Sequence, residues 1–111
     1  MAAISTHILN ASLGQPAVGV LVQLFQQTDH GLVLRDEQFT DVDGRVKAFE
    51  TISLTEGDYQ LIFNIAEYFQ SLAVESFYPR VCIDFKVADI QQHYHVPLLI
   101  SPFSYSTYRG S

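Results

Sequence analysis

VCIDFKV, residues 81–87, alternates apolar and polar side chains at every position. A period of two is typical of a β-strand that buries one of its faces. Residues 59–63, YQLIF, alternate in the same way except at Ile62, which indicates that both faces of this strand are partly covered. Similar segments recur at short intervals, and we predict strands over residues 4–9, 17–25, 32–38, 46–54, 58–63, 80–87, 92–100 and 104–108. This pattern favours an all-β sandwich of two antiparallel sheets.

One segment departs from the strand pattern. Ile65 and Phe69 are four residues apart, as on one face of a helix. Asn64 and Glu67 have the spacing of a capping box, in which two side chains satisfy the free N–H groups at a helix start. We therefore predict a short helix over residues 64–70 that lies on the sandwich.

The composition is that of a small folded protein. Hydrophobic residues make up 48% of the 111 residues and charged residues 16%, which excludes a disordered chain. A chain of this length is expected to form a single domain over residues 1–111. A net charge of −6, with only 6 Lys and Arg, excludes nucleic acid as a partner. The low density of charge leaves apolar surface that another copy of the chain could cover, which favours a homo-oligomer.

The sequence also bears on the compartment. Its single cysteine, Cys82, cannot form an internal disulfide, so no oxidising compartment is required. The first residues lack the basic start and apolar core of a signal peptide. No apolar run approaches the length needed to span a membrane. We expect a soluble cytoplasmic protein that does not bind membranes.

Residues that could carry chemistry are concentrated in HYHVPLLI, residues 93–100. On a strand, His93 and His95 lie on one face, and Tyr94 lies on the other with the apolar residues. Two histidines at this spacing can begin a zinc site, but a catalytic zinc needs a third protein ligand, which spacing alone does not supply. The residues alone therefore leave open both a metal site and ordinary hydrogen-bonded or exposed histidines. Pro97 lacks an N–H, so we expect this strand to be interrupted or to lie at a sheet edge.

Three further features are less distinctive on their own. His7 shares one face of its predicted strand with Ser5 and would ordinarily be a surface histidine. The turn dipeptide DG at residues 43–44 places Arg45 at the start of a strand, where its head would ordinarily be solvated. The segment 104–111 keeps aromatic strand character, so we predict an ordered tail.

Together these segments resemble the 5-hydroxyisourate hydrolases, the enzymatic branch of the transthyretin-like family. The resemblance covers almost the whole chain. Its motifs are ISTHIL at 4–9, GQPA at 14–17, TDVDGR at 40–45, FYP at 77–79, HYHVPLL at 93–99 and YRGS at 108–111. Each motif is weak alone, whereas several in this order make a specific signature. Two residues, Val42 and Ser104, depart from the family's pattern, and neither is at a catalytic position.

The resemblance implies a transthyretin-like fold, with two four-stranded antiparallel sheets and one short helix. It also implies a homotetramer in which facing subunits enclose a channel that contains the active sites. The family's catalytic positions, carried over by motif, are His7, Arg45, His95 and Ser111. Its substrate-binding positions are those four together with Tyr108, Arg109 and Gly110. His93 is outside the catalytic set, and the resemblance implies neither a metal nor another cofactor.

The reaction implied by the resemblance is hydrolytic opening of the six-membered ring of 5-hydroxyisourate, a small-molecule substrate from urate (purine) catabolism. The product is 2-oxo-4-hydroxy-4-carboxy-5-ureidoimidazoline. Water must attack a carbonyl carbon near neutral pH, so a base has to take its proton and a cation has to hold the oxyanion. We expect His7 and His95 to activate the water and protonate the leaving nitrogen, and Arg45 to hold the anionic substrate. Ser111 would orient a histidine or the substrate through its hydroxyl or terminal carboxylate.

Three other functions remain open from the sequence. A non-enzymatic transthyretin-like carrier would bind a small aromatic ligand in the same channel, although such carriers lack the set of His, Arg and YRGS. A metal-binding sandwich would use His93 and His95. A structural interaction domain would use the ordered tail as an accessory strand. Because a fold does not determine a function, these alternatives have to be separated at the site.

Overall fold

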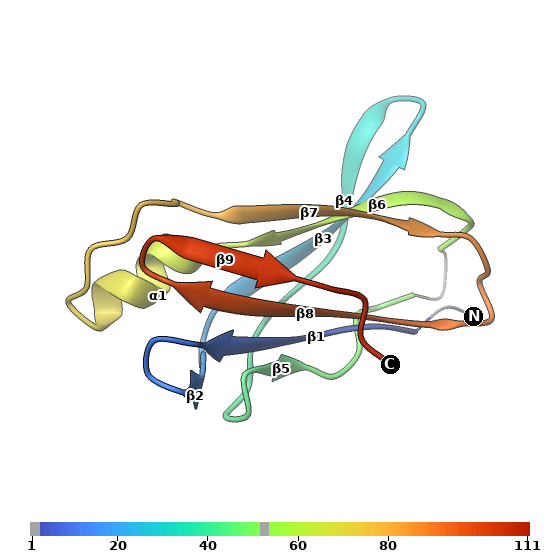
Figure 1. Ribbon diagram of the computed structural model, residues 1–111. Helices are drawn as coiled ribbons and strands as arrows, with labels where there is room; N and C mark the ends of the chain where they lie inside the picture. The colour runs from blue at the N-terminus through green and yellow to red at the C-terminus, as the bar shows by residue number, and fades with distance from the viewer. Residues whose placement is uncertain (1–2, 52–53) are drawn as a thin grey trace.

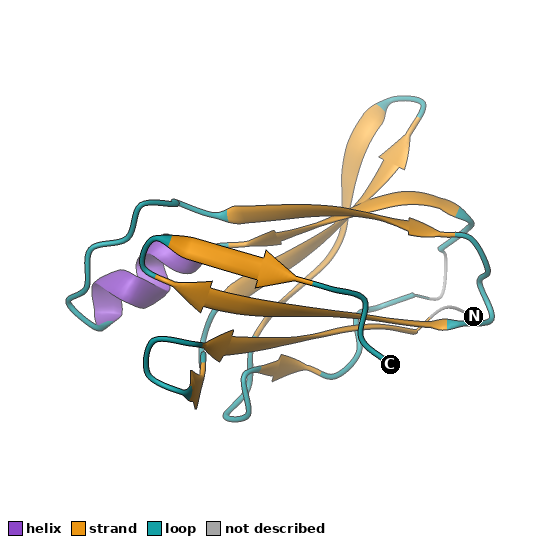
Figure 2. Ribbon diagram, in the orientation of Figure 1, coloured by secondary structure: helices purple, strands orange, loops and turns teal. Residues whose placement is uncertain are grey.

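Two β-sheets packed face to face make up the protein in the computed structural model, which describes residues 3–51 and 54–111 (Figure 1). The first sheet has the strand order β2-β1-β8-β9, with β5 also paired to β1, and the second has the order β4-β3-β6-β7. The first sheet contains β1 (Ala3–Asn10), β2 (Gln15–Pro16), β5 (Arg45–Val46), β8 (His93–Ser101) and β9 (Ser104–Thr107). The second contains β3 (Leu21–Thr28), β4 (Gly31–Phe39), β6 (Gly57–Phe63) and β7 (Val81–Val87). The predicted two-sheet sandwich with one short helix is confirmed (Figure 2).

The alternation along each strand decides which side chains fill the space between the sheets. Ile4 and Leu98 of the first sheet are fully buried, as is Leu61 of the second. Burial of such side chains is worth about 25 cal/mol per Å² of apolar surface and holds the two layers together. The residues that alternate with the buried ones along β8 point to the outer face of the sheet. Among them, His93 is exposed and His95 is half-buried. The core therefore leaves one face of the first sheet free for other chemistry.

β1 and β8 run in the same direction, whereas the other described ladders are antiparallel. Their register places Ser5 opposite His95 and His7 opposite Pro97. A parallel pair needs a crossover connection, and here the connection includes the whole second sheet. This pair is the exception to the antiparallel sheets predicted from the sequence.

Pro97 lies inside β8, which continues from His93 to Ser101. The strand is neither interrupted nor at an edge, because it lies between β1 and β9. The ladder between β8 and β9 begins at Leu98, so the N–H that Pro97 lacks would lie just outside this ladder. The Pro97 carbonyl accepts a hydrogen bond from Thr107 Oγ1 at 2.6 Å. The expectation of an interrupted or edge strand was wrong.

Helix α1 (Ile65–Ser71) confirms the predicted short helix, one residue further along the chain. Ile65 and Phe69 are buried against the sandwich, as their spacing predicted. The capping box was wrong, because Asn64 makes no side-chain hydrogen bond to the helix. The side-chain nitrogen Nδ2 of Asn64 instead donates to the Leu21 carbonyl at 3.1 Å, which connects the start of the helix to β3. In the described part of the chain, no helix is long and apolar enough to cross a membrane.

The strand predicted over residues 17–25 begins late, at Leu21. The chain turns at Gly19, which has a φ of 78°. Thr40 stabilises this turn, because its Oγ1 accepts from the Val20 N–H at 2.9 Å and donates to a carbonyl of the same turn at 2.7 Å. The apolar residues before Leu21 therefore belong to a turn that buries Ala17 and Val20 and exposes Val18, which explains the error.

The strand predicted over residues 46–54 is reduced to β5, and residues 52–53 of this prediction lie outside the described residues. Beyond β5 the chain donates one backbone hydrogen bond to β1, from the Phe49 N–H to the Ile4 carbonyl at 2.9 Å. Phe49 is buried in the core. The apolar pattern that predicted a long strand thus reflects side-chain packing and not a ladder.

Candidate active site

The outer face of the first sheet gathers the residues that the sequence singled out. The parallel ladder pairs Ser5 of β1 with His95 of β8. The antiparallel ladder pairs His7 of β1 with Arg45 of β5. Residues paired across a ladder place their side chains on the same face of the sheet. With His93 two residues before His95, five polar side chains from three strands share this face.

A cavity of about 230 Å³ lies over this face. Its described lining consists of Ser5, Thr6, Arg45, Val46, Lys47, His93, His95 and Ser111. The lining combines cationic side chains, imidazoles and hydroxyls, which suits a small anionic ligand. Three of the predicted catalytic residues, Arg45, His95 and Ser111, therefore meet at one cavity. The fourth, His7, is half-buried on the same sheet face and close enough for its charge to act on His95.

A tight turn before β5 positions Arg45. Asp41 Oδ1 accepts hydrogen bonds from the N–H of Asp43 at 2.9 Å and of Arg45 at 3.0 Å, and the Arg45 bond is the largest cause that lowers the pKa of Asp41. Gly44 has a φ of 75°, and a Cβ on it would lie 2.5 Å from the Ile8 carbonyl oxygen. Only glycine fits there. The Arg45 guanidinium forms no ion pair within the described residues, so its charge is available to a ligand.

Ser5 connects the two histidines of β8. Its Oγ lies 2.8 Å from His93 Nε2 and 2.8 Å from His95 Nδ1. Ser5 is 5% exposed, so this hydroxyl is largely shielded from bulk water. Among the residues that the structure describes, His95 Nε2 has no hydrogen-bonding partner. The ring is therefore held through one nitrogen, and the other is free.

The pKa of His95 lies below its ordinary value of 6.5. Burial of the ring is the largest cause, because a buried site disfavours the charged imidazolium. The positive charges of His93, Arg45 and His7 lower the pKa further, and a hydrogen bond with Ser5 opposes them in part. At neutral pH His95 is therefore a neutral imidazole that can accept a proton.

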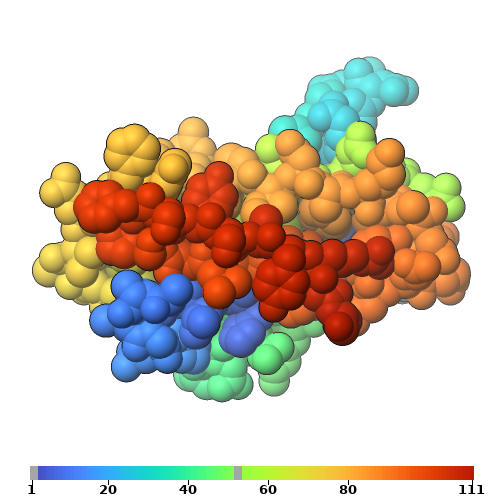
Figure 3. Space-filling model, viewed as in Figure 1, coloured from blue at the N-terminus to red at the C-terminus, as the bar shows by residue number. Residues whose placement is uncertain are grey.

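The tail that follows β9 packs directly on His95. The Gly110 N–H donates to the His95 carbonyl at 2.8 Å. A Cβ on Gly110 would lie 2.5 Å from His95 Cδ2 and 3.2 Å from Pro97 Cγ, so the site has no room for a side chain there. This contact brings Ser111 to the cavity. Figure 3 shows the tail, in red, crossing the surface of the molecule.

Tyr108 and Arg109 line a different cavity, of about 300 Å³, beside β7. Arg109 stacks over the Tyr94 ring, with its guanidinium carbon 4.8 Å from the ring centroid. The Tyr108 side chain is exposed. The structure thus separates these two side chains from Arg45, whereas His95 lines both cavities.

The sequence placed neither Ser5 nor His93 in the catalytic set and suggested His93 only as a possible metal ligand, yet both line the cavity with His95. The sequence contained part of the information needed to find them. Ser5 shares a strand face with His7, and His93 shares one with His95. The missing information was the register of β1 against β8, which joins Ser5 to a residue 90 positions away.

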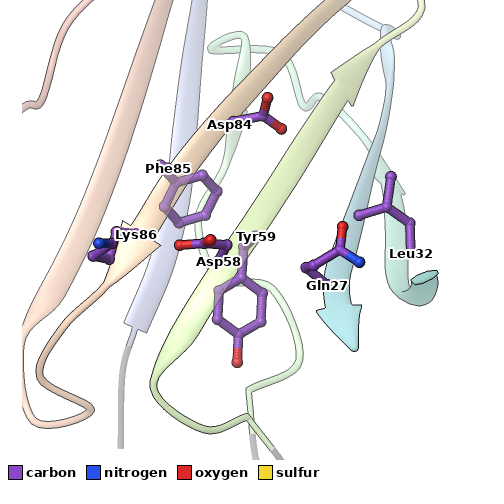
Figure 4. Close-up of a pocket in the computed structure, with 7 residues that line it drawn as sticks. All are labelled: Gln27, Leu32, Asp58, Tyr59, Asp84, Phe85 and Lys86. Atoms are coloured by element: carbon purple, nitrogen blue, oxygen red, sulfur yellow. The ribbon is translucent and has the colours of Figure 1, made fainter. Parts of the chain in front are cut away.

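A larger cavity of about 430 Å³ lies on the second sheet (Figure 4). Its described lining consists of Gln27, Leu32, Asp58, Tyr59, Asp84, Phe85 and Lys86. The carboxylates of Asp58 and Asp84 point in different directions in Figure 4. The Tyr59 hydroxyl donates to the Thr55 carbonyl. This lining offers no histidine as a base near neutral pH, so the smaller cavity on the first sheet is the candidate site.

The geometry of the histidines also bears on a metal site. His93 and His95 have ring centroids 6.2 Å apart and share the Ser5 hydroxyl. Within residues 3–51 and 54–111, no three His, Cys, Asp or Glu side chains come together in a group that could hold a metal ion. In that part of the chain, the two histidines lack the third ligand that a zinc site needs.

Known proteins of one family match this chain over almost its full length. The model of the HIUase/Transthyretin family matches residues 4–110. A 5-hydroxyisourate hydrolase of Salmonella dublin is 43% identical over 109 residues, which cover 97% of this chain and 80% of that protein. The structure of a Klebsiella pneumoniae 5-hydroxyisourate hydrolase superposes with a TM-score of 0.89 at 37% identity, covering 100% of both chains. Sea bream transthyretin in complex with thyroxine superposes with a TM-score of 0.90 at 26% identity, covering 96% of this chain and 93% of that one. The chain therefore belongs to the HIUase/transthyretin family.

Proposed function

We propose that this protein hydrolyses 5-hydroxyisourate to 2-oxo-4-hydroxy-4-carboxy-5-ureidoimidazoline, a step of urate catabolism. The observation that carries the proposal is the convergence of Arg45, His95 and Ser111 on one cavity. The similarity to the 5-hydroxyisourate hydrolases of Salmonella dublin and Klebsiella pneumoniae supports the same reaction. All the groups that this chemistry needs come from the chain, so the proposed reaction requires no cofactor.

Neutral His95 is the general base of the proposed reaction. Its lowered pKa keeps the ring unprotonated near neutral pH, so the ring can take a proton from the attacking water. A positioned base or acid of this kind contributes about 10²–10⁴-fold to a rate. His7, opposite Arg45 in the ladder, assists in activating the water and in protonating the leaving nitrogen.

Arg45 binds the oxygen-rich substrate and stabilises the oxyanion that forms when water attacks the carbonyl carbon. The bond between that carbon and the ring nitrogen then breaks. The carbon becomes the carboxylate of the product, and the nitrogen takes a proton and becomes the end of the ureido group. The Ser111 hydroxyl, in the same cavity, orients the substrate or the His95 ring.

The remaining residues of the tail hold this arrangement together. Gly110 fixes the tail to His95 through its N–H. Arg109 anchors the tail from the other side through its contact with Tyr94. The resemblance to the family assigns Tyr108, Arg109 and Gly110 to substrate binding, and the contacts of the single chain favour an anchoring role for Arg109 and Gly110.

The proposed enzyme is a homotetramer. β7 and β9 end their sheets and leave an unpaired edge on each sheet of the single chain. Unpaired edges are templates for pairing with another chain. The outer face of the first sheet is also open, since His93 is exposed and His7 half-buried. A facing pair of subunits would cover this face and enclose the cavity in a channel.

Residues 1–111 are proposed to form one domain, and the match of a single family model to residues 4–110 supports this. A cytoplasmic location is proposed as well. It is supported by the single cysteine, which requires no oxidising compartment.

A carrier is the main alternative, because sea bream transthyretin shares the fold. The cavity of about 230 Å³ is smaller than the roughly 300–1,000 Å³ of sites for drug-sized ligands. Its lining contains Arg45, Lys47 and two imidazoles, which favour a small anion over a large aromatic ligand. The site thus supports hydrolysis better than transport.

Decay of freshly generated 5-hydroxyisourate, followed by ultraviolet absorbance, tests the proposal. Arg45→Ala and His95→Asn should each lower kcat/KM by about 100-fold or more while remaining folded, because each removes a group that acts in the transition state. Arg35→Ala and His30→Asn are matched controls that change the same residue types on the β3–β4 hairpin. Wild-type rates in both site variants would contradict the proposal.

A further inference from the structure

The hydroxyl of Ser5 has one hydrogen and two imidazole neighbours. Its Oγ lies 2.8 Å from His93 Nε2 and 2.8 Å from His95 Nδ1. The hydroxyl can donate its hydrogen to one ring only, so it must accept a hydrogen from the other. The three side chains therefore form a directional chain, and its direction decides which nitrogen of His95 carries a proton.

The two directions have different chemical consequences. In the first, His95 Nδ1–H donates to Ser5, Ser5 donates to His93 Nε2, and His95 Nε2 has a free lone pair. In the second, His93 Nε2–H donates to Ser5, Ser5 donates to His95 Nδ1, and His95 Nε2 carries the hydrogen. Nε2 is the nitrogen without a partner among the described residues. Only the first direction lets it act as a base.

His95 and His93 differ in their exposure to water. The charged or titratable side chains that line or face the cavity are His7, Arg45, Lys47, His93 and His95. His95 is half-buried, and its charged form is disfavoured by burial and by the cations beside it. His93 is exposed, so water can solvate a positive charge on its ring. Passing a proton from His95 to His93 through Ser5 therefore moves the positive charge to the ring that is exposed to water.

We propose that Ser5 and His93 form a proton relay behind His95, an inference that rests on the proposed hydrolase function. As the water oxygen bonds to the substrate carbonyl carbon, a water proton goes to His95 Nε2. The Nδ1 proton passes to Ser5 Oγ, and the Ser5 proton passes to His93 Nε2. When the ring C–N bond breaks, the transfers reverse, and His95 Nε2–H protonates the leaving nitrogen. Ser5 and His93 act through His95 and are positioning residues.

The tautomer of His95 tests the direction of the chain without an activity measurement. In ¹⁵N-labelled wild-type protein at neutral pH, NMR of the ring nitrogens should show Nδ1 protonated and Nε2 unprotonated. The ring signals that disappear in the His95→Gln variant are assigned to His95. Ser5→Ala removes the acceptor of the Nδ1 proton and should shift His95 toward the Nε2–H form. A wild-type His95 with the proton on Nε2 would overturn the inference.

Variants test the relay itself. Ser5→Ala should lower kcat by about 10–100-fold with little change in KM. Ser5→Thr keeps the hydroxyl and should restore most of kcat. His93→Gln keeps a hydrogen-bonding group beside Ser5 but cannot take up a proton, so it should lower kcat by a similar factor. The double variant Ser5→Ala/His93→Gln should be no slower than the slower single variant, because both changes break the same chain.

His30→Gln is the matched control, since His30 is an exposed histidine on the turn between β3 and β4. It should keep the wild-type kcat. A wild-type kcat in His93→Gln, or losses that multiply in the double variant, would overturn the relay. Failure of the proposed function has a different signature, a wild-type protein without turnover, and would overturn the relay together with the function.

Discussion

Gly110 meets the His95 ring without space for a side chain. A Cβ on Gly110 would lie 2.5 Å from His95 Cδ2. We predict that Gly110→Ala lowers kcat/KM by about 10–100-fold, because misplacing a catalytic group by about 1 Å can cost that much. The free energy of unfolding, measured by urea denaturation, should change by less than about 1 kcal/mol, since the tail can move away from the ring.

Gly14→Ala is the control for this change. Gly14 has a φ of 66°, and no atom lies within 4 Å of the position of its Cβ. A side chain in this left-handed conformation costs about 1–2 kcal/mol. Gly14→Ala should therefore lower the free energy of unfolding and keep the activity, the opposite of Gly110→Ala. Equal losses of activity in the two variants would contradict the role of Gly110.

The lowered pKa of His95 predicts that both stability and activity depend on pH. Burial is its largest cause, followed by the charges of His93, Arg45 and His7. As the pH falls, His95 of the unfolded chain takes up a proton near pH 6.5, whereas His95 of the folded protein does so only at a lower pH. The free energy of unfolding therefore decreases as the pH falls from 6.5 through the pKa of the folded state. The same shift favours neutral His95 just below pH 6.5, so we expect kcat/KM to remain high there.

An NMR titration of His95 measures this pKa directly. In His95→Gln the free energy of unfolding should decrease less as the pH falls, because glutamine takes up no proton. A folded pKa at or above 6.5 would contradict the account of the site.

The site could be predicted from the sequence only in part. His7 and Arg45 are ordinary residues in their segments, and only the family's motifs selected them. The strand that carries His93 and His95 was suggestive by itself, and the resemblance selected His95 over His93. Ser5 and His93 needed the register of β1 against β8, which no local pattern carries. The contact that turns Arg109 toward Tyr94 likewise depends on the path of the tail across the sheet.

Among the structural elements, we expect the turn between β4 and β5 to affect the proposed reaction through the position of Arg45. Asp41 accepts the N–H groups of Asp43 and Arg45. We predict that Asp41→Ala raises KM by about 10-fold through misplacement of Arg45, and lowers the free energy of unfolding, because two backbone N–H groups of the turn lose their acceptor. Asp43→Ala removes the same charge from the same turn and should leave both close to wild type. KM is measured by steady-state kinetics and the free energy of unfolding by urea denaturation. If Asp41→Ala and Asp43→Ala changed these quantities equally, this role of Asp41 would be wrong.

Most strands could be predicted because burial of one face imposes a period of two. The prediction over residues 17–25 failed where Thr40 stabilises a turn that buries Ala17 and Val20. The prediction over residues 46–54 failed where Phe49 packs into the core without a ladder. In both places an apolar pattern marks burial and not strand pairing. The parallel pairing of β1 and β8 could not be predicted, because alternation along a strand is the same in either direction.

For the molecule as a whole, the edges that β7 and β9 leave open in the described part of the chain, together with the open outer face, predict assembly. Four chains of 12.5 kDa give about 50 kDa, which sedimentation should detect. Dilution to the single chain should lower the activity per chain, because the cavity then loses the subunits that enclose it. A monomer with full activity would contradict the proposed tetramer.

The fold by itself does not separate hydrolysis from transport. The chain superposes on a 5-hydroxyisourate hydrolase with a TM-score of 0.89 and on transthyretin in complex with thyroxine with one of 0.90. The distinction lies in the side chains on one sheet face, where Arg45, His95 and Ser111 meet.

The number of 5-hydroxyisourate molecules consumed per chain distinguishes a hydrolase from a carrier. With substrate in large excess over protein, a hydrolase converts many equivalents to the ring-opened product, whereas a carrier removes at most one per site. We predict turnover that continues until the substrate is exhausted, faster than the protein-free decay, and lost in Arg45→Ala. Consumption that stops at one equivalent, or a rate equal to the protein-free decay, would contradict the account.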